Sequence, residues 1–216
     1  MIPLAIFMIG RTAAGKTTLS EDLCKQLAIP YVSEAAKKRE LKPAYTTEDS
    51  LDESLRDRAY HLAIKECCAH VSAGTPSLVD ASFHKRYRRD WLYSAAQAAH
   101  ARAVVGIYCR CPSRAVTTSR ITARRTAKKT AKTHADSMTI YDFIDANFDE
   151  PSIAELPPLI SSALFCVDSQ NNQLTVESIS RDGDFDLSLL ELQTWLIAYL
   201  SRCADEPLSL GGSEKA

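Results

Sequence analysis

Short runs of apolar residues recur along the chain, separated by longer stretches in which apolar residues have helical spacing. The first run is nearly continuous and ends at a glycine. Runs of this length are typical of strands that are buried on both faces of a parallel sheet. The pattern predicts strands over residues 3–9, 30–33, 77–81, 103–109 and 164–168.

Most of the stretches between these runs predict helices, because their apolar residues recur at intervals of three and four. Residues 34–41 are mainly polar and predict a helical turn or two. Residues 174–179 alternate instead and predict a small extra strand. The first helix ends before Pro30, which disfavours helical backbone in the residue that precedes it. The expected helices cover residues 17–27, 34–41, 84–100, 113–125, 136–147 and 187–200.

A further helix is expected between residues 50 and 74. Ser50 and Glu53 have the spacing of a capping box, which marks a helix start. Gly74 suits the position just after a helix end. The predicted apolar face of this helix consists of Leu51, Leu55, Ala59, Leu62 and Cys67.

Strands that alternate with helices in this way indicate an α/β fold of three layers, a parallel sheet with helices on both faces. A length of 216 residues suits one such domain. We therefore expect a single domain over residues 1–203. Residues 204–216 are expected to form a mobile tail.

The composition is that of an ordinary globular protein, with 45% hydrophobic and 25% charged residues and a formal net charge of −1. The charge is unevenly spread, since residues 110–135 hold eight Lys or Arg and no Asp or Glu. The seven cysteines form no CxxC pair, which favours reduced thiols. No apolar stretch approaches the roughly 20 residues of a membrane span. We expect a cytoplasmic protein.

The sequence GRTAAGKT follows the first predicted strand and precedes the first predicted helix. It fits G-x-x-x-x-G-K-[ST], in which backbone N–H groups and the helix N-terminus surround phosphate oxygens. In this motif the lysine reaches the β- and γ-phosphates and the hydroxyl residue holds Mg²⁺. The residues expected to bind ATP are Gly10, Arg11, Thr12, Ala13, Ala14, Gly15, Lys16, Thr17 and Thr18.

Phosphate loops occur in GTPases, motor ATPases and kinases. The chain lacks the [NT]KxD and DxxG motifs of GTPases, and it is short for a ring-forming ATPase. A kinase needs a base, cations for the transferring group, and a cover that excludes water. Glu34 is a candidate base because it ends the second predicted strand, and Lys37 follows within one helical turn. The alternative is that Glu34 is only a favourable acid in the first turn of a helix.

Two further features point to a kinase. Asp80 ends the third predicted strand and could hold Mg²⁺ or substrate. Arg120 and Arg124 lie on one helix face in the basic stretch, where guanidinium groups suit a phosphoryl group. We expect a lid over residues 120–136, an RNA-binding patch and a solvated basic helix being the alternatives.

These motifs together resemble a family of small P-loop kinases related to zeta toxins, chloramphenicol phosphotransferase and the kinase domains of polynucleotide kinases. The resemblance spans about residues 2–168. The family motif S-[ST]-D-x-x-R is matched by Ser33, Glu34 and Lys37, so that Glu replaces Asp and Lys replaces Arg. The DATF motif is matched by Asp80-Ala81-Ser82-Phe83, with Arg89 nine residues after the aspartate. The proline and R-x-x-x-R that follow strand four are matched by Pro112, Arg120 and Arg124.

The resemblance implies a sheet of about five strands in the order 2-3-1-4-5. It implies that Glu34 is the base and that Lys37 binds substrate. It also implies that Asp80 and Arg89 line the acceptor pocket, and that Arg120 and Arg124 act from the lid.

The resulting hypothesis is an ATP- and Mg²⁺-dependent phosphotransferase that moves the γ-phosphate to a hydroxyl of a small molecule. Lys16, Glu34, Arg120 and Arg124 would be catalytic, while Thr17 and Asp80 would hold the metal. One alternative is a polynucleotide 5′-hydroxyl kinase, which the basic segments would suit. A second is a nucleotide-binding sensor without transfer activity. The oligomeric state stays open.

Overall fold

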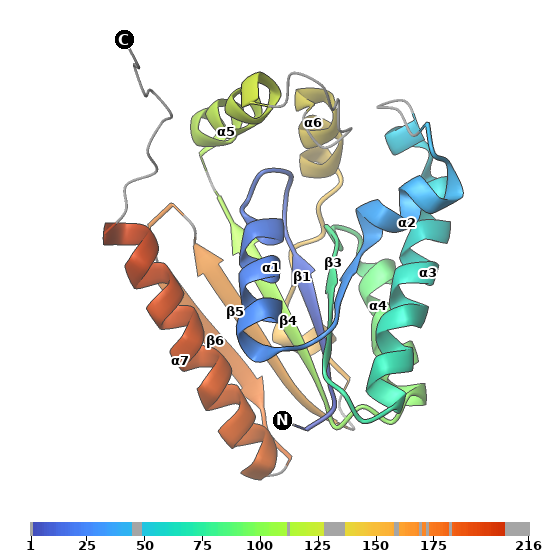
Figure 1. The fold of residues 1–216 in the computed structure, drawn as a ribbon, viewed down its shortest axis with the longest axis vertical. Coiled ribbons are helices and arrows are strands. Elements are labelled where there is room, and N and C mark those ends of the chain that lie inside the picture. The colour runs from blue at the N-terminus through green and yellow to red at the C-terminus, as the bar shows by residue number, and fades with distance from the viewer. Residues whose placement is uncertain are drawn as a thin grey trace.

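The computed structural model describes residues 2–44, 49–111, 113–127, 137–157, 160–168, 170–171, 173–181 and 183–205 (Figure 1). The described residues contain a six-stranded sheet in the order β2-β3-β1-β4-β5-β6. The strands are β1 (Leu4–Ile9), β2 (Tyr31–Ser33), β3 (Ser77–Asp80), β4 (Ala103–Arg110), β5 (Ser161–Asp168) and β6 (Gln173–Ile179). The first five are parallel, which confirms the expected fold class and the order 2-3-1-4-5. β6 adds an antiparallel edge strand beside β5.

The α-helices of the described chain flank this sheet or lie over one end of it. They are α1 (Lys16–Leu27), α2 (Glu34–Leu41), α3 (Glu53–Ser72), α4 (Arg86–Ala98), α5 (Arg114–Ala127), α6 (Met138–Ala146) and α7 (Gly183–Asp205). Two short 3₁₀ turns, η1 (Asp49–Leu51) and η3 (Ile153–Glu155), lie in connections. α5 and α6 lie over the carboxyl ends of the parallel strands, at the top of Figure 1.

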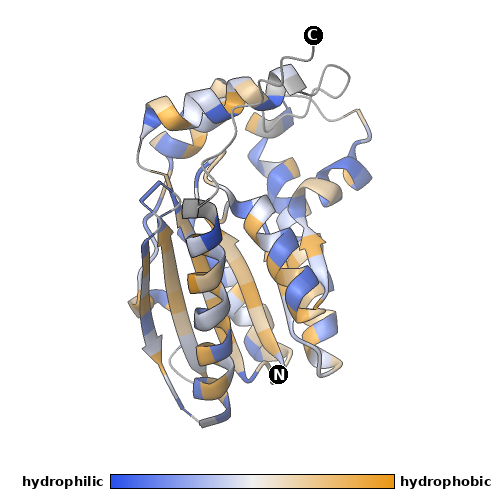
Figure 2. Cartoon of the chain, turned by 60° about the vertical axis from the view of Figure 1, so that its left-hand side comes forward, coloured by the Kyte–Doolittle hydropathy of each residue, from blue (hydrophilic) through white to orange (hydrophobic). Residues whose placement is uncertain are grey.

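The core has two halves because successive side chains of a strand point to opposite faces. From β1, Leu4, Ile6 and Met8 pack against α1 and α7. The intervening residues Ala5, Phe7 and Ile9 pack against α3 and α4. Figure 2 shows the result, apolar strands inside helices that are polar on their outer sides. This three-layer arrangement leaves the carboxyl ends of the strands available for a site.

The start of α3 differs from the prediction. Its N-cap is Asp52, whose Oδ1 accepts hydrogen bonds from the backbone N–H groups of Ser54 (2.9 Å) and Leu55 (3.2 Å). Ser50 lies in η1 instead, so the predicted capping box is wrong. An aspartate directly before the first turn accepts these bonds and also suits the positive end of the helix. The predicted end is confirmed, because Gly74 follows the C-cap with φ +83°.

The buried face of α3 matches the predicted apolar face in part, since Ala59 and Cys67 are buried. Leu51 and Leu62 are 39% and 38% exposed. Positions on the inner side are instead occupied by two large polar residues, Arg56 and Tyr60, together with small apolar ones. The hydrophobic pattern missed this face because the helix lies beside a polar site rather than wholly against the core.

Parts of the predicted lid and tail lie outside the described residues. These parts are residues 128–136 of the lid and 206–216 of the tail, while residues 204 and 205 continue α7. Within the described chain, no helix has the length and apolar character needed to cross a bilayer. The six cysteines whose side chains are described are free thiols.

Candidate active site

The turn between β1 and α1 has backbone geometry that requires glycine at two points. Gly10 has φ +144°, and a Cβ there would lie 2.4 Å from the carbonyl oxygen of Cys109. Gly15 has φ +95° at the N-cap of α1, where the absence of a side chain leaves room next to the helix N-terminus. The N–H of Gly10 donates to the carbonyl of Ser82 at 3.0 Å and so ties the turn to the end of β3.

Lys16 folds back over this loop. Its Nζ donates to the carbonyl oxygens of Gly10 (2.9 Å) and Arg11 (2.8 Å). Burial lowers the pKa of Lys16, and the negative charge of Asp80 opposes that effect. The ammonium group is therefore held by neutral carbonyls, which an anionic phosphate would replace with a stronger partner.

Asp80 ends β3 and accepts two hydrogen bonds on Oδ2, from the Thr17 hydroxyl (2.7 Å) and from the Tyr31 hydroxyl (2.9 Å). Burial raises the pKa of Asp80, while Lys16, Thr17 and Tyr31 oppose the rise. Thr17 and Asp80 together offer hard oxygen donors beside the loop. Mg²⁺ takes one or two protein oxygens of this kind along with phosphate oxygens, so the pair fits it.

Glu34 opens α2 directly after β2, where Ser33 caps the helix by accepting a hydrogen bond from the N–H of Ala36. Glu34 Oε1 lies 2.7 Å from Lys38 Nζ, one helical turn on, and both side chains are buried. Burial lowers the pKa of Lys38, and the charge of Glu34 opposes that change. The structure thus pairs the predicted base with a lysine that the sequence analysis passed over.

Lys37, the predicted substrate ligand, points elsewhere. Its Nζ forms ion pairs with Glu40 (2.8 Å) on α2 and Glu66 (2.6 Å) on α3. One residue along a helix turns the side chain by about 100°, so Lys37 and Lys38 face different surroundings. The expectation that Lys37 contacts substrate is not supported by this placement; Lys38 takes the position beside Glu34.

Arg89 is also outside the site, fully buried behind it. Its Nε and Nη2 donate to Glu155 at 2.8 and 3.0 Å, and its Nη1 donates to the carbonyls of Phe83 and Asp149, both at 2.9 Å. These bonds join α4 to the segment that leads to β5. The geometry corrects the expected pocket role of Arg89 to a structural one.

The two lid arginines lie on α5. Arg120 Nη1 donates to the carbonyl of Ala13 at 3.2 Å, and Ala13 also packs against Ile121 and Tyr141. Arg124 lines the central cavity and its charge contributes to the lowered pKa of Lys16. α5 is therefore packed on the loop, with Arg124 toward the cavity. Pro112, the proline of the resemblance, lies outside the described residues.

Two further members of the predicted ATP-binding set do not present side chains to the cavity. Arg11 forms an ion pair with Asp145 on α6 and another with Glu150, and its guanidinium lies 4.2 Å from the centre of the Phe148 ring. It ties the phosphate loop to the segment that starts at α6. Thr18 is exposed in the first turn of α1.

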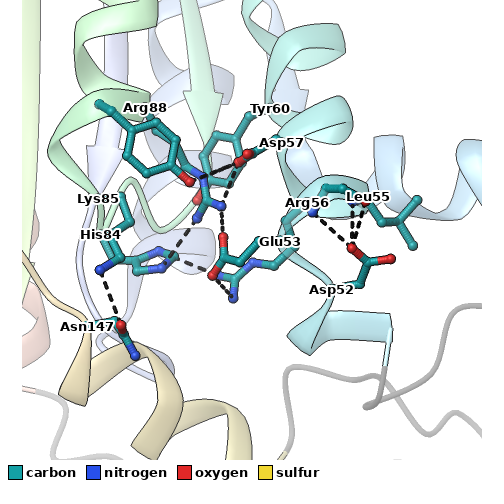
Figure 3. Close-up of polar contacts among 12 residues, drawn as sticks. Asp52, Glu53, Leu55, Arg56, Asp57, Tyr60, His84, Lys85, Arg88 and Asn147 are labelled. Atoms are coloured by element: carbon teal, nitrogen blue, oxygen red, sulfur yellow. Dashed lines mark hydrogen bonds and ion pairs between the residues drawn. The ribbon is translucent and has the colours of Figure 1, made fainter.

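A buried polar cluster around His84 and Arg88 was not found from the sequence (Figure 3). His84 Nε2 accepts a hydrogen bond from Arg88 Nη1 at 3.3 Å, since a guanidinium only donates. His84 Nδ1 lies 3.0 Å from Ser82 Oγ and 3.5 Å from Arg56 Nη2. Burial lowers the pKa of His84, as do the charges of Arg56 and Arg88. Tyr60 completes the network through its 2.7 Å bond to Ser82.

The arginines of this cluster are held by acids and rings. Arg88 donates to Asp57 at 2.6 and 2.8 Å and pairs with Glu53. Arg56 lies 3.9 Å from Glu53 and 5.2 Å from the centre of the Phe143 ring. The available sequence signals were an arginine among apolar positions of α3 and the segment HKRYRR directly after strand three.

A cavity of about 120 Å³ lies where these elements meet. It brings together Lys16, Thr17, Glu34, Asp80 and Arg124 from the predicted site, while Lys37 and Arg89 do not line it. α6 closes one side with Ile140 and Ile144. The other lining residues are Thr12, Ala13, Gly15, Ala35, Lys38, Arg56, Ala81 and Ser82.

The sequence profile of the AAA domain family AAA_33 matches residues 6–148, which is more than half of the chain and covers every residue of the cavity. The chain belongs to this family. AAA_33 is a family of P-loop kinases, so the family and the strand order agree with the P-loop kinase fold expected from the sequence. The finer resemblance to zeta toxins, chloramphenicol phosphotransferase and polynucleotide kinases stays a prediction.

Solved structures share the fold of this AAA_33 member. A protein provisionally described as a kinase, from Chloroflexus aurantiacus J-10-fl, aligns with a TM-score of 0.58 at 23% identity, covering 78% of this chain and 89% of its own. A sugar kinase from Janibacter sp. HTCC2649 aligns with a TM-score of 0.57 at 15% identity, and the alignment covers 97% of this chain and 98% of the sugar kinase. A gluconokinase from Sinorhizobium meliloti 1021 aligns with a TM-score of 0.52 at 16% identity, and the alignment covers 94% of each chain. Among curated proteins no sequence matches.

Proposed function

We propose that this protein is an ATP- and Mg²⁺-dependent phosphotransferase whose acceptor is a hydroxyl group of a small molecule. The observation that carries the proposal is a single cavity lined at once by the phosphate-loop residues Lys16 and Thr17 and by the buried carboxylate of Glu34. A kinase needs this combination, because phosphate and acceptor hydroxyl must meet next to a proton acceptor.

The nucleotide side of the cavity would hold the phosphates through the N–H groups of the loop and the positive end of α1. Lys16 would exchange its two carbonyl partners for phosphate oxygens. Thr17 and Asp80 would hold Mg²⁺, which when bound neutralises charge on the phosphates. Arg120, bonded to Ala13, would keep the loop in place.

In the transfer step the acceptor hydroxyl gives its proton to Glu34 as its oxygen bonds to the γ-phosphorus. The bond from that phosphorus to the β–γ bridging oxygen breaks, and ADP leaves with the bonding electrons. Lys38, whose Nζ lies 2.7 Å from Glu34 Oε1, would hold this carboxylate in place beside the acceptor hydroxyl. Lys16 and Arg124 would stabilise negative charge on the transferring group.

The described lining of the cavity, which includes no aromatic side chain, favours a small acceptor over a polynucleotide. The two isoleucines of α6 border it on one side, and its volume is about 120 Å³. A nucleic-acid strand would need an open groove with stacking surfaces along which bases can lie.

The proposal is tested by measuring ATP consumption with pools of hydroxyl metabolites and, separately, with 5′-hydroxyl oligonucleotides. We expect turnover with a small acceptor that requires Mg²⁺ and is lost in Lys16→Ala. Turnover of oligonucleotides alone would instead establish the polynucleotide alternative. Tight ATP binding with no acceptor in either pool would establish the sensor alternative.

A further inference from the structure

The charges around the cavity are unbalanced. Among the described lining residues, two side chains are carboxylates, Glu34 and Asp80. Four are cations, namely Lys16, Lys38, Arg56 and Arg124. Cations gathered in a partly enclosed space favour an anionic ligand, since burial weakens solvent screening.

These cations form two groups. Lys16 belongs to the phosphate loop, where its Nζ donates to the carbonyls of Gly10 and Arg11, and Arg124 comes from α5, which contacts the same loop through Arg120. Lys38 lies on α2, 2.7 Å from Glu34, and Arg56 comes from α3, which packs against α2. A nucleoside triphosphate with Mg²⁺ engages the first group. Lys38 and Arg56 remain at the acceptor side, where Glu34 lines the cavity and Glu53 lies 3.9 Å from Arg56.

The surroundings of Arg56 hold its side chain in this position. Its side chain is 2% exposed, and it comes from the inner face of α3, next to η1. Glu53 lies beside the guanidinium, and His84 Nδ1 lies 3.5 Å from Nη2 (Figure 3). The centre of the Phe143 ring lies 5.2 Å from the guanidinium carbon. Because the ring of His84 is neutral, the positive charge on this side of the cavity comes from the lining residues Arg56 and Lys38. A planar guanidinium in a fixed orientation suits a carboxylate or a phosphate, which it binds through two parallel hydrogen bonds.

We propose that the acceptor carries an anionic group, a carboxylate or a phosphate, which binds Arg56 and Lys38 while a nearby hydroxyl faces Glu34. This inference rests on the proposed phosphotransferase function and names its substrate class. The two cations then select the substrate by charge, and Glu34 performs the proton transfer.

The first test compares acceptors that differ at one terminal group, a carboxylate in one and a neutral hydroxymethyl in the other. Gluconate is paired with glucitol, glycerate with glycerol, and glycerol 3-phosphate is added to separate phosphate from carboxylate. A charge-assisted hydrogen bond contributes about 1.5–3 kcal/mol, so we expect the preferred acid to exceed its neutral partner about 10- to 150-fold in kcat/KM. Equal or better turnover of the neutral partners would overturn the inference.

The second test uses two arginines on the same helix. Arg56→Gln should raise the acceptor KM about 10- to 150-fold for acids and leave neutral acceptors and the KM for ATP unchanged. Arg58→Gln, at an exposed position two residues on, should match the wild type. Equal loss with acidic and neutral acceptors would contradict a charge-selecting role. If Arg56→Gln does not fold, Arg56→Lys and the wild-type comparison of acidic with neutral acceptors still test the inference.

A binding measurement separates this inference from the proposed function. Malonate and methyl phosphate carry the anionic group and lack a hydroxyl, so they report binding without turnover. Titrated into protein saturated with Mg·ADP, they should bind the wild type and Lys16→Ala equally and Arg56→Gln at least about 10-fold more weakly. Arg56-dependent binding of these probes, together with no phosphorylation of any acceptor in the turnover assays, would refute the phosphotransferase and keep the anion site. Binding that Lys16→Ala abolishes would refute the anion site.

Discussion

The hydroxyl of Thr17, in the first turn of α1, donates a 2.7 Å hydrogen bond to Asp80 at the carboxyl end of β3. The two residues are 63 positions apart in sequence and join the phosphate loop to the neighbouring strand. The Gly10 N–H to Ser82 carbonyl bond makes a second link between the same two elements. The loop and the acceptor side of the cavity are thereby held in one frame, as in-line transfer requires.

This relationship predicts how Asp80→Asn changes metal dependence. The amide retains an acceptor for the Thr17 hydroxyl but loses the charge that attracts Mg²⁺. Loss of a group that orients a metal ligand typically costs 10- to 100-fold in metal affinity, so we expect half-maximal activity at about 10–100 times more Mg²⁺. Asp22→Asn, exposed on α1, is the matched control. An unchanged Mg²⁺ titration would argue against Asp80 as a metal-site residue.

Glu34→Gln tests the base. The amide keeps the size of the side chain but cannot accept the hydroxyl proton, and general-base catalysis is worth about 10²–10⁴ in rate. We expect kcat to fall by that factor while ATP affinity stays the same, as measured by steady-state kinetics and calorimetry. Glu40→Gln on the exposed side of α2 should leave kcat unchanged. A Glu34→Gln enzyme with full kcat would assign the base elsewhere.

Two adjacent lysines provide a stability test. Lys38→Met leaves the buried carboxylate of Glu34 without its 2.7 Å partner, which typically costs about 3–5 kcal/mol. Lys37→Met removes ion pairs with the more exposed Glu40 and Glu66, worth about 1 kcal/mol or less. Urea unfolding of both variants at neutral pH measures the difference. Equal losses would show that the two lysines have similar surroundings.

The contrast between these lysines shows what the sequence could predict of the site. The phosphate loop was readable because strand, glycines, lysine and helix are contiguous, and the bounds of α2 at residues 34–41 were predicted correctly. The choice between Lys37 and Lys38 depends on the rotation of a short helix about its axis, which one polar sequence of eight residues does not fix. The motif spacing of the resemblance favoured Lys37, whereas the structure places Lys38 beside Glu34.

The remaining residues of the acceptor side could not be predicted from the local sequence. Arg56 comes from α3, Ser82 and His84 follow β3, and Arg88 comes from α4. Each alone resembles a surface residue, and only packing of α3 against α4 buries them together. The parallel sheet was predictable because alternation of strands and helices is a property of the whole chain.

Arg89→Met tests the structural role that replaces the predicted pocket role. The change leaves Glu155 buried without its two hydrogen bonds, so we expect a loss of about 3–5 kcal/mol in unfolding free energy. The KM for both substrates should stay near the wild-type value in the folded fraction. Arg86→Met, whose 3.8 Å pair with Asp90 is exposed, should change stability by less than about 1 kcal/mol. A large KM effect with full stability would restore Arg89 to the site.

His84 makes a prediction for acid stability. Burial and two arginines keep the pKa of His84 low in the folded protein, whereas in the unfolded chain it returns to about 6.5. The stability that its neutral ring contributes is therefore complete above about pH 6.5 and is lost as the pH falls below that value. The loss approaches about 1.4 kcal/mol per pH unit for one proton. Urea unfolding of wild type and His84→Gln between about pH 7.5 and 4.5 should give curves whose difference has this slope. His100→Asn, at an exposed position, should retain the wild-type curve. If wild type and His84→Gln lose stability in parallel, His84 is protonated in the folded protein and the hydrogen-bond assignment to Arg88 is wrong.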